Sequence, residues 1–109
     1  MTAEEFQRYW RKTHAALVAE RAEVLGIRRY VQFHTADLPR LHQSLQRRNG
    51  GAPQPYDGVA ELWFDSLDDF VGGSPEKTQA SAELLADERN FIDLPNSPMW
   101  LGEEHVVVG

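Results

Sequence analysis

The stretch DGVAELWF, residues 57–64, carries most of the information about the fold of this chain. Asp57 and Gly58 are a turn signal, and the mainly apolar residues from Val59 to Phe64 are typical of a β-strand. Successive residues of a strand point to opposite faces of its sheet, and this strand is apolar on both. Both faces of the predicted sheet must therefore be covered.

Two neighbouring segments predict what pairs with this strand and what covers it. Residues 27–34 alternate between apolar and polar side chains, which predicts a second strand. Residues 2–24 predict a helix, because Thr2 and Glu5 have the form of a capping box and apolar residues recur every three or four positions. Gly26 supplies the expected stop.

The C-terminal half completes the predicted order helix, strand, strand, helix, strand. Residues 66–70 are typical of one helical turn. Ser74 as N-cap and Pro75 at the first helical position then predict a helix that runs to about Asp87. Residues 99–108 predict a terminal strand with apolar residues of both parities.

A long polar connection separates the two internal strands. It covers residues 35–56, is rich in proline and glycine, and shows no strand pattern, although residues 38–48 could form a short helix. A loop of this length in a small domain is either mobile or covers a site.

The predicted elements leave one face of the sheet without a cover. Two helices can cover only one face of a sheet this small, so the second apolar face implies a partner surface. That face is either Ala60, Leu62 and Phe64 or else Val59 and Trp63. We therefore expect a homodimer that packs sheet to sheet.

Length and composition restrict the function classes. A chain of 109 residues is expected to form one domain, and 41% hydrophobic with 26% charged residues is typical of a globular protein. Eleven basic against seventeen acidic residues give a net charge of -6, which argues against nucleic acid and membrane partners. The chain has no cysteine, no membrane-length apolar run and no signal peptide pattern, so we expect a cytoplasmic protein without disulfides.

Four blocks of the sequence together resemble the EthD family. They are EFQRYWRKTHA at 5–15, RYVQ at 29–32, YDGVAELWFDSL at 56–67, and an ending that runs from FID at 91–93 through SP at 97–98 to EHVV at 104–107. The resemblance extends from residue 2 to the C-terminus except for the loop at 35–55. It implies one EthD-like domain over 1–109 with the dimeric α+β barrel fold. In that fold a ferredoxin-like antiparallel sheet carries two helices on one face, with a hydrophobic cavity between the sheet and the helices.

The chain departs from the family pattern in two places. Family members usually have the order βαββαβ, with the first strand in the middle of the sheet, whereas here Met1 is followed at once by the helix cap. Either residues upstream of Met1 are missing, or a rearrangement or a partner's strand fills the gap. Unpaired interior strands cost about 1–3 kcal/mol for each buried polar group, which favours a shortened sequence. The second departure is Ala15, where relatives commonly have proline, so the helix can continue past His14.

His14 is the first candidate for acid–base chemistry. It lies on the apolar side of the predicted first helix, one turn from Trp10 and near Leu17. Its titration near neutral pH suits a proton shuttle, but a buried histidine that is bonded to a backbone carbonyl has the same sequence pattern. The family block at 5–15 gives the two interpretations equal weight.

Three further residues are candidates for orienting a substrate or relaying a proton. His105 shares a strand face with Glu103, which would raise the pKa of its imidazole, although an exposed edge histidine has the same pattern. Glu61 is the one charge in an apolar strand, so we expect it to be paired with a cation or to face a cavity. Tyr30 offers a phenol on the sheet and is otherwise a packing residue.

Several other kinds of site are not expected. His34 and His42 lie at or beyond a strand end, where a solvated histidine is the simpler interpretation. No histidine or acidic spacing suits a metal, and the Gly50-Gly51 and Gly72-Gly73 pairs lack the context of a phosphate-binding loop. We therefore expect neither a metal nor a cofactor.

The resemblance suggests an enzyme that acts on a small apolar, aromatic or polyketide-like molecule. Relatives in the superfamily use their cavities for cofactor-free oxidation of aromatic polyketides, as monooxygenases do, or for cyclisation of poly-β-ketone chains. The expected acid–base groups are His14, His105, Glu61 and Tyr30. The expected apolar wall is Trp10, Trp63, Trp100 and Leu17. The alternatives are a non-catalytic binding or accessory protein for an oxygenase or degradation pathway, and a dimeric module without a ligand.

Overall fold

The first helix begins where the capping box predicts. The Thr2 hydroxyl accepts a hydrogen bond from the Glu5 backbone N–H at 3.1 Å, and the Thr2 N–H donates to the Glu5 carboxylate at 3.2 Å. In the computed structural model, which describes all residues 1–109, α1 (Ala3–Arg8), the π-helical turn η1 (Tyr9–His14) and α2 (Ala15–Leu25) follow one another without a break. Gly26 ends the helix with φ 77°, a left-handed conformation that glycine adopts at little cost.

The sheet consists of two antiparallel strands, β1 (Arg29–His34) and β2 (Gly58–Trp63). Their register pairs Arg29 with Trp63 and His34 with Gly58. The alternation of side chains places Tyr30, Gln32 and His34 on the face that contacts the long helix, where the ring of Trp10 stacks on His34. The opposite face is formed by Arg29, Val31, Phe33, Val59, Glu61 and Trp63.

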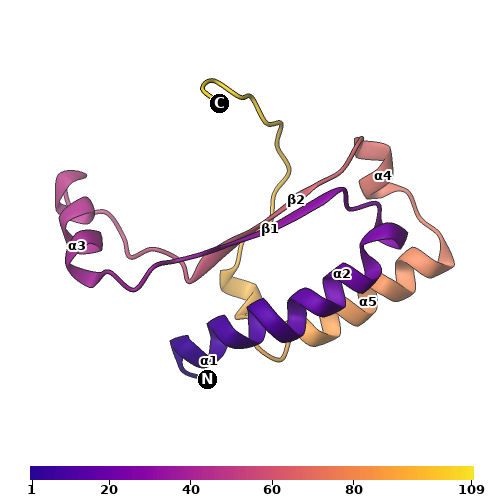
Figure 1. Ribbon diagram of the computed structural model, residues 1–109, viewed down its shortest axis with the longest axis horizontal. Helices are drawn as coiled ribbons and strands as arrows, with labels where there is room; N and C mark the ends of the chain where they lie inside the picture. The colour runs from indigo at the N-terminus through magenta and orange to yellow at the C-terminus, as the bar shows by residue number, and fades with distance from the viewer.

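The two predicted segments after β2 are helical. Ser66 caps α4 (Leu67–Val71) by accepting a hydrogen bond from the Asp69 N–H at 3.2 Å. Ser74 caps α5 (Pro75–Glu88) in the same way through the Lys77 N–H at 3.1 Å. Figure 1 shows α5 running alongside α2 below the sheet, so that both long helices lie on one face of it. The predicted α+β architecture is confirmed.

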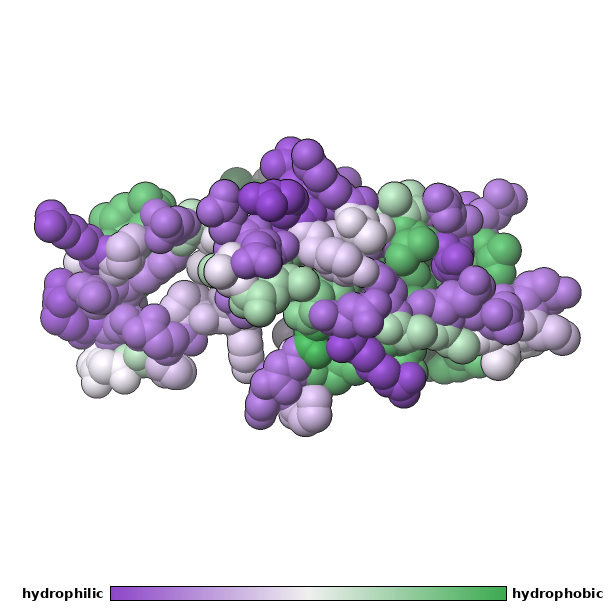
Figure 2. All heavy atoms as spheres, turned by 90° about the horizontal axis from the view of Figure 1, so that it is seen from below, coloured by the Kyte–Doolittle hydropathy of each residue, from purple (hydrophilic) through white to green (hydrophobic).

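The buried core is small and lies where the helices meet the sheet. Its buried apolar centre consists of Val18 from α2, Ile27, and Leu84 from α5. Leu17 and Tyr30 are among the partly buried residues that pack against it. The outer side of the helices, seen in Figure 2, is mostly hydrophilic with smaller hydrophobic areas between the charged side chains. None of the helices is both long and apolar enough to cross a membrane.

The long connection contains the predicted short helix. It is α3 (Pro39–Arg48), which begins with proline in its first turn. Figure 1 places α3 at one end of the molecule, beyond the strands and away from α2 and α5. The connection therefore does not cover the helix side of the sheet.

The predicted terminal strand at 99–108 is wrong. After α5 the chain makes the short 3₁₀ turn η2 (Leu94–Asn96), and no strand follows it. Figure 1 shows this C-terminal segment passing the sheet and ending on the side away from the helices. The sheet contains only β1 and β2, and neither of them pairs with the C-terminal segment. In the ferredoxin-like order the last strand pairs with a strand that precedes the first helix.

Candidate functional site

The π-helical turn η1 determines which side chains of the first helix point into the interior of the protein. In a π-helix the hydrogen bonds join residues i and i+5 and each turn holds more residues than in an α-helix, so residues five apart lie near the same face. In an α-helix, with 3.6 residues per turn, the same two residues would be turned well away from each other. Tyr9 and His14 are five apart, and both reach the end of α5. His14 is buried with 5% of its surface exposed, as is its neighbour Trp10.

Asp87, in the last turn of α5, joins these side chains. Its Oδ2 lies 2.7 Å from Nδ1 of His14, and its Oδ1 accepts a hydrogen bond from the Tyr9 hydroxyl at 2.5 Å. Asn90 Nδ2 donates to the same Oδ1 at 3.4 Å. Asp87 is buried, with 9% of its surface exposed. Tyr9, His14, Asp87 and Asn90 are called the Asp87 cluster below.

The cluster keeps the Asp87 carboxylate ionised. Burial alone would raise the pKa of Asp87, but the hydrogen bonds from Tyr9, His14 and Asn90 outweigh it and lower that pKa below its usual value. The hydrogen bond to Asp87 in turn raises the pKa of the Tyr9 phenol. An ionised carboxylate only accepts hydrogen bonds, so Nδ1 of His14 carries a hydrogen. Nε2 is then the ring nitrogen that can take up a proton.

Aromatic rings surround this imidazole. The ring of Phe91, which follows α5, has its centroid 5.0 Å from that of His14 and 5.0 Å from that of Tyr9. Phe6 of α1 lies between Phe91, at 5.6 Å, and Trp10, at 5.7 Å. The surroundings of the His14 ring are therefore largely apolar.

A second polar network occupies the face of the sheet next to Trp10. The Gln32 side chain donates to the Trp10 carbonyl at 2.9 Å and to the Tyr30 hydroxyl at 2.8 Å, and its Oε1 lies 2.7 Å from His34 Nε2. The rings of His34 and Trp10 stack with their centroids 4.4 Å apart. Burial raises the pKa of Tyr30, whereas burial and the charge of Arg11 lower the pKa of His34.

Gly58 makes this close packing of Trp10 against the sheet possible. A Cβ atom at position 58 would lie 2.4 Å from an atom of the Trp10 ring and 2.4 Å from the Phe33 carbonyl oxygen. The glycine that marked a turn in the sequence is thus also required for the contact between helix and sheet.

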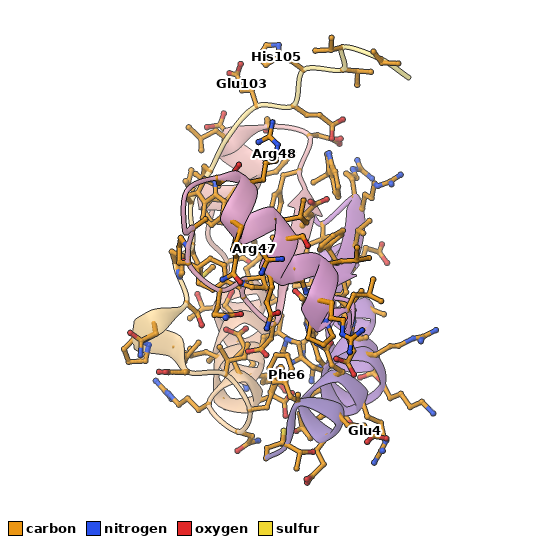
Figure 3. The ribbon with its side chains drawn as sticks, turned by 90° about the vertical axis from the view of Figure 1, so that its left-hand side faces the viewer. Glu4, Phe6, Arg47, Arg48, Glu103 and His105 are labelled. Carbon is orange, nitrogen blue, oxygen red and sulfur yellow. The ribbon has the colours of Figure 1, made fainter.

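The structure brings together only part of the predicted site. His14 and Trp10 are buried in the same turn, Tyr30 is linked to Trp10 through Gln32, and Leu17 packs against the core. Two predicted residues lie far from them on the C-terminal segment, where Trp100 is 74% exposed and the His105 side chain 81% exposed. Figure 3 shows Glu103 and His105 at the opposite end of the molecule from Phe6. His105 Nε2 lies 3.8 Å from the Glu103 carboxylate, but both side chains are in solvent.

Glu61 and Trp63 lie on the open face of the sheet. The guanidinium of Arg29 stands over the Trp63 ring at 5.0 Å, and the Trp63 indole N–H donates to Glu104 at 3.0 Å. Glu61 is exposed and forms no ion pair, so the expectation that it is paired or faces a cavity is wrong. Nothing covers this face in the single chain, so water solvates the carboxylate and no partner is needed.

The expected hydrophobic cavity between sheet and helices is not formed. Instead an open hollow of about 610 Å³ lies there, with no hydrophobic residue in its lining. Its lining residues are Gln7, Arg8, Arg11, Lys12, Gln32 and His34. His34 is therefore not the solvated loop residue that we expected: it ends β1, is half-buried and is held by two neighbours.

Sequence reasoning missed Asp87 as a member of the site. One signal was present: Asp87 and Glu88 form the end of α5, where the helix dipole disfavours negative charge, and no basic residue lies in that turn. A carboxylate in such a position needs a compensating partner. That the partners are Tyr9 and His14 follows only from the packing of α5 against η1.

Fold and site together define an α+β domain with a buried carboxylate, imidazole and phenol cluster between its two long helices. A model of the family described as EthD domain matches residues 1–95, and the chain belongs to this family, whose fold is of the ferredoxin-like α+β type. The matched residues include the whole Asp87 cluster and exclude Trp100 and His105. Neither a curated protein nor a solved structure matches the chain.

Proposed function

We propose that this EthD domain protein is an acid–base enzyme in which Nε2 of His14 removes a proton from a small apolar or aromatic molecule. The observation that carries the proposal is the buried pair of His14 and Asp87, with Tyr9 on the second carboxylate oxygen. A carboxylate on one ring nitrogen fixes the tautomer of the imidazole and stabilises the imidazolium that forms when the other nitrogen takes a proton.

In the proposed step, the proton leaves the substrate for Nε2, and the substrate retains the electron pair as an enolate or phenolate. The imidazolium then lies beside the ionised Asp87, and the proton is later returned. This step is common to cyclisation and to cofactor-free oxidation of phenolic or ketonic compounds. General base catalysis accelerates such reactions by about 10²–10⁴-fold. The rings of Phe6 and Phe91 support an apolar substrate.

Access to His14 depends on Phe91. The imidazole is only 5% exposed, so a substrate reaches Nε2 only after a neighbouring ring moves aside. Phe91 lies in the turn after α5 rather than within a helix, so its side chain and backbone are less constrained than those of Trp10. The proposal therefore assigns to Phe91 the role of the ring that is displaced.

A proton exchange assay tests the proposal without knowledge of the natural substrate. The probe is 2-tetralone, an aromatic ketone with activated C–H hydrogens, and proton NMR in deuterated buffer follows their replacement. We expect the wild-type protein to accelerate the exchange and His14→Gln to reduce that acceleration about a hundredfold. The matched control is His42→Gln on α3, which should retain the wild-type rate within about twofold.

Two outcomes would contradict the acid–base role. One is an exchange rate with wild-type protein that equals that of buffer, and the other is a folded His14→Gln variant within about twofold of wild type. Binding of the ketone without exchange, at equal affinity in both proteins, would instead support the non-catalytic binding protein.

We further propose that the protein is a homodimer in which the open faces of two sheets pack together. This face exposes 63% of Phe33 and 37% of Val59, and it includes the half-buried Val31 and Trp63. Apolar side chains in such a group are typical of a surface that another subunit covers.

A further inference from the structure

The open hollow beside η1 has a charge opposite to that of the chain as a whole. Three of its six lining side chains are cationic, none is acidic and none is hydrophobic, whereas the chain has a net charge of -6. The hollow lies on the outer side of the turn that holds His14 and uses none of the members of the Asp87 cluster. It is therefore a separate feature that needs its own explanation.

Two of the three cations have no counter-ion in the protein. Arg8 pairs with Glu4 at 3.3 Å, but Arg11 and Lys12 take part in no ion pair. The charge of Arg11 reaches across the hollow, since it helps to lower the pKa of His34 on the opposite wall. An anion in the hollow would balance these charges.

On the opposite wall of the hollow, hydrogen bonds fix the orientation of the Gln32 amide and the tautomer of the His34 ring. Because Gln32 Nε2 donates to the Trp10 carbonyl, Gln32 Oε1 must accept from His34, so Nε2 of His34 carries a hydrogen. Nδ1 of His34 makes no hydrogen bond within the chain and becomes a donor when the ring is protonated. Gln7 is held in the same way, with its Nε2 bonded to the Asp57 carbonyl at 2.9 Å, while its buried Oε1 has no partner.

We propose that this hollow binds the oxyanion group of a small molecule, a carboxylate or a phosphate, with Arg11 and Lys12 supplying the charge and His34 a titratable donor. Positive side chains without counter-ions on one wall and a preorganised imidazole on the other are what such a group requires. The inference does not depend on the proposed acid–base function.

Titration of the full chain with three anions tests the site. Sodium sulfate, sodium phosphate and sodium benzoate are added at low ionic strength, and proton–nitrogen NMR follows the side-chain amides of Gln7 and Gln32 and the backbone amides of 8–12. We expect saturable shifts that sodium chloride at matched ionic strength does not produce. A stronger response to benzoate identifies a carboxylate ligand, and a stronger response to phosphate identifies a phosphate ligand.

A pair of charge-matched variants makes the test specific. Arg11→Gln combined with Lys12→Gln should weaken sulfate binding at least about tenfold, because each lost charge-assisted hydrogen bond reduces affinity by roughly that factor. Arg47→Gln combined with Arg48→Gln removes the same charge from α3, which Figure 1 places at one end of the molecule beyond the strands, and should change the affinity less than about twofold. Equal weakening in both variants, or shifts that follow ionic strength alone, would overturn the proposal.

The pH dependence of sulfate binding tests the role of His34. The charged groups on the helix side of the ring are Arg8, Arg11 and Lys12, its own strand contributes Tyr30 through Gln32, and its partner on β2 is Gly58. Sulfate keeps its charge between pH 8 and pH 5.5, so tighter binding at the lower pH would report protonation of His34. The His34→Gln variant should bind with no such increase, and an unchanged pH dependence in this variant would exclude His34 as the titrating group.

Discussion

Asp87 is the residue on which the buried cluster depends, because Tyr9, His14 and Asn90 all bond to its carboxylate. Its lowered pKa means that the folded state stabilises the ionised form of Asp87 more than the unfolded chain does. The stability gained in this way is fully present above the unfolded pKa of about 4 and is lost as the pH falls through the folded pKa.

We predict that Asp87→Asn lowers the free energy of unfolding at pH 7 by about 1–3 kcal/mol, since it weakens several buried hydrogen bonds. Below about pH 4 the difference between the variant and the wild type should shrink. Urea unfolding at a series of pH values measures both effects. The control is Asp65→Asn, whose exposed pair with Arg28 should contribute less than about 1 kcal/mol. Parallel pH curves for Asp87→Asn and wild type would refute this role of Asp87.

His14 shows how far single residues could be predicted. Its position on the apolar side of the first helix follows from the periodicity, and the structure buries it there. Its partner Asp87 is 73 residues away, and no local pattern links the two. An α-helical projection places Tyr9 and His14, five residues apart, on different sides of the helix. The π-helical turn instead brings both to one carboxylate.

At the scale of elements, helices were easier to predict than strands because their signals are local. The caps at Thr2, Ser66 and Ser74 and the stop at Gly26 lie within a few residues of the helix ends that they determine. The apolar pattern at 99–108 has the local character of a strand, but a strand also needs a neighbour to accept its hydrogen bonds. No such neighbour is present, and the pattern alone could not reveal this.

The C-terminal segment gives a prediction at this scale. None of the backbone N–H groups of residues 99–109 donates a hydrogen bond to another backbone group. We therefore expect their amide hydrogens to exchange with deuterated solvent without measurable protection, in contrast to those of β1 and the middle of α2. Hydrogen exchange measured by NMR on a sample at low concentration tests this. Protection at alternate residues of the segment would contradict it and would indicate a paired strand.

The whole molecule exposes more surface than its size requires. A folded chain of 12.4 kDa is expected to expose about 6,100 Å², whereas this one exposes 8764 Å². Its radius of gyration of 16.1 Å likewise exceeds the roughly 13 Å expected for a compact domain of this length. Part of this excess belongs to the extended C-terminal segment, and another part to the open face of the sheet, which the homodimer proposed above would cover.

We predict that Phe33→Glu dissociates this homodimer, because it replaces the most exposed apolar side chain of the open face with a carboxylate, in addition to the one that Glu61 already places there. Sedimentation velocity should show wild-type protein at twice the mass of the chain and the variant at the mass of one chain at micromolar concentration. The matched control is Leu41→Glu, which places the same charge on an equally exposed apolar residue of α3 and should leave the dimer intact. A monomeric wild-type protein, or a dimer that persists in Phe33→Glu, would contradict the proposed interface.

The π-helical turn at Tyr9–His14 also affects how the chain can evolve. If one of the four residues between Tyr9 and His14 were deleted, an ordinary α-helix would place the tyrosine and the histidine on one face, since they would then be four apart. If the turn became α-helical while its length stayed the same, the two would be five apart in an α-helix, would turn away from each other, and only one could reach Asp87. A change to α-helical geometry must therefore be accompanied by the loss of one residue in any descendant that retains the cluster.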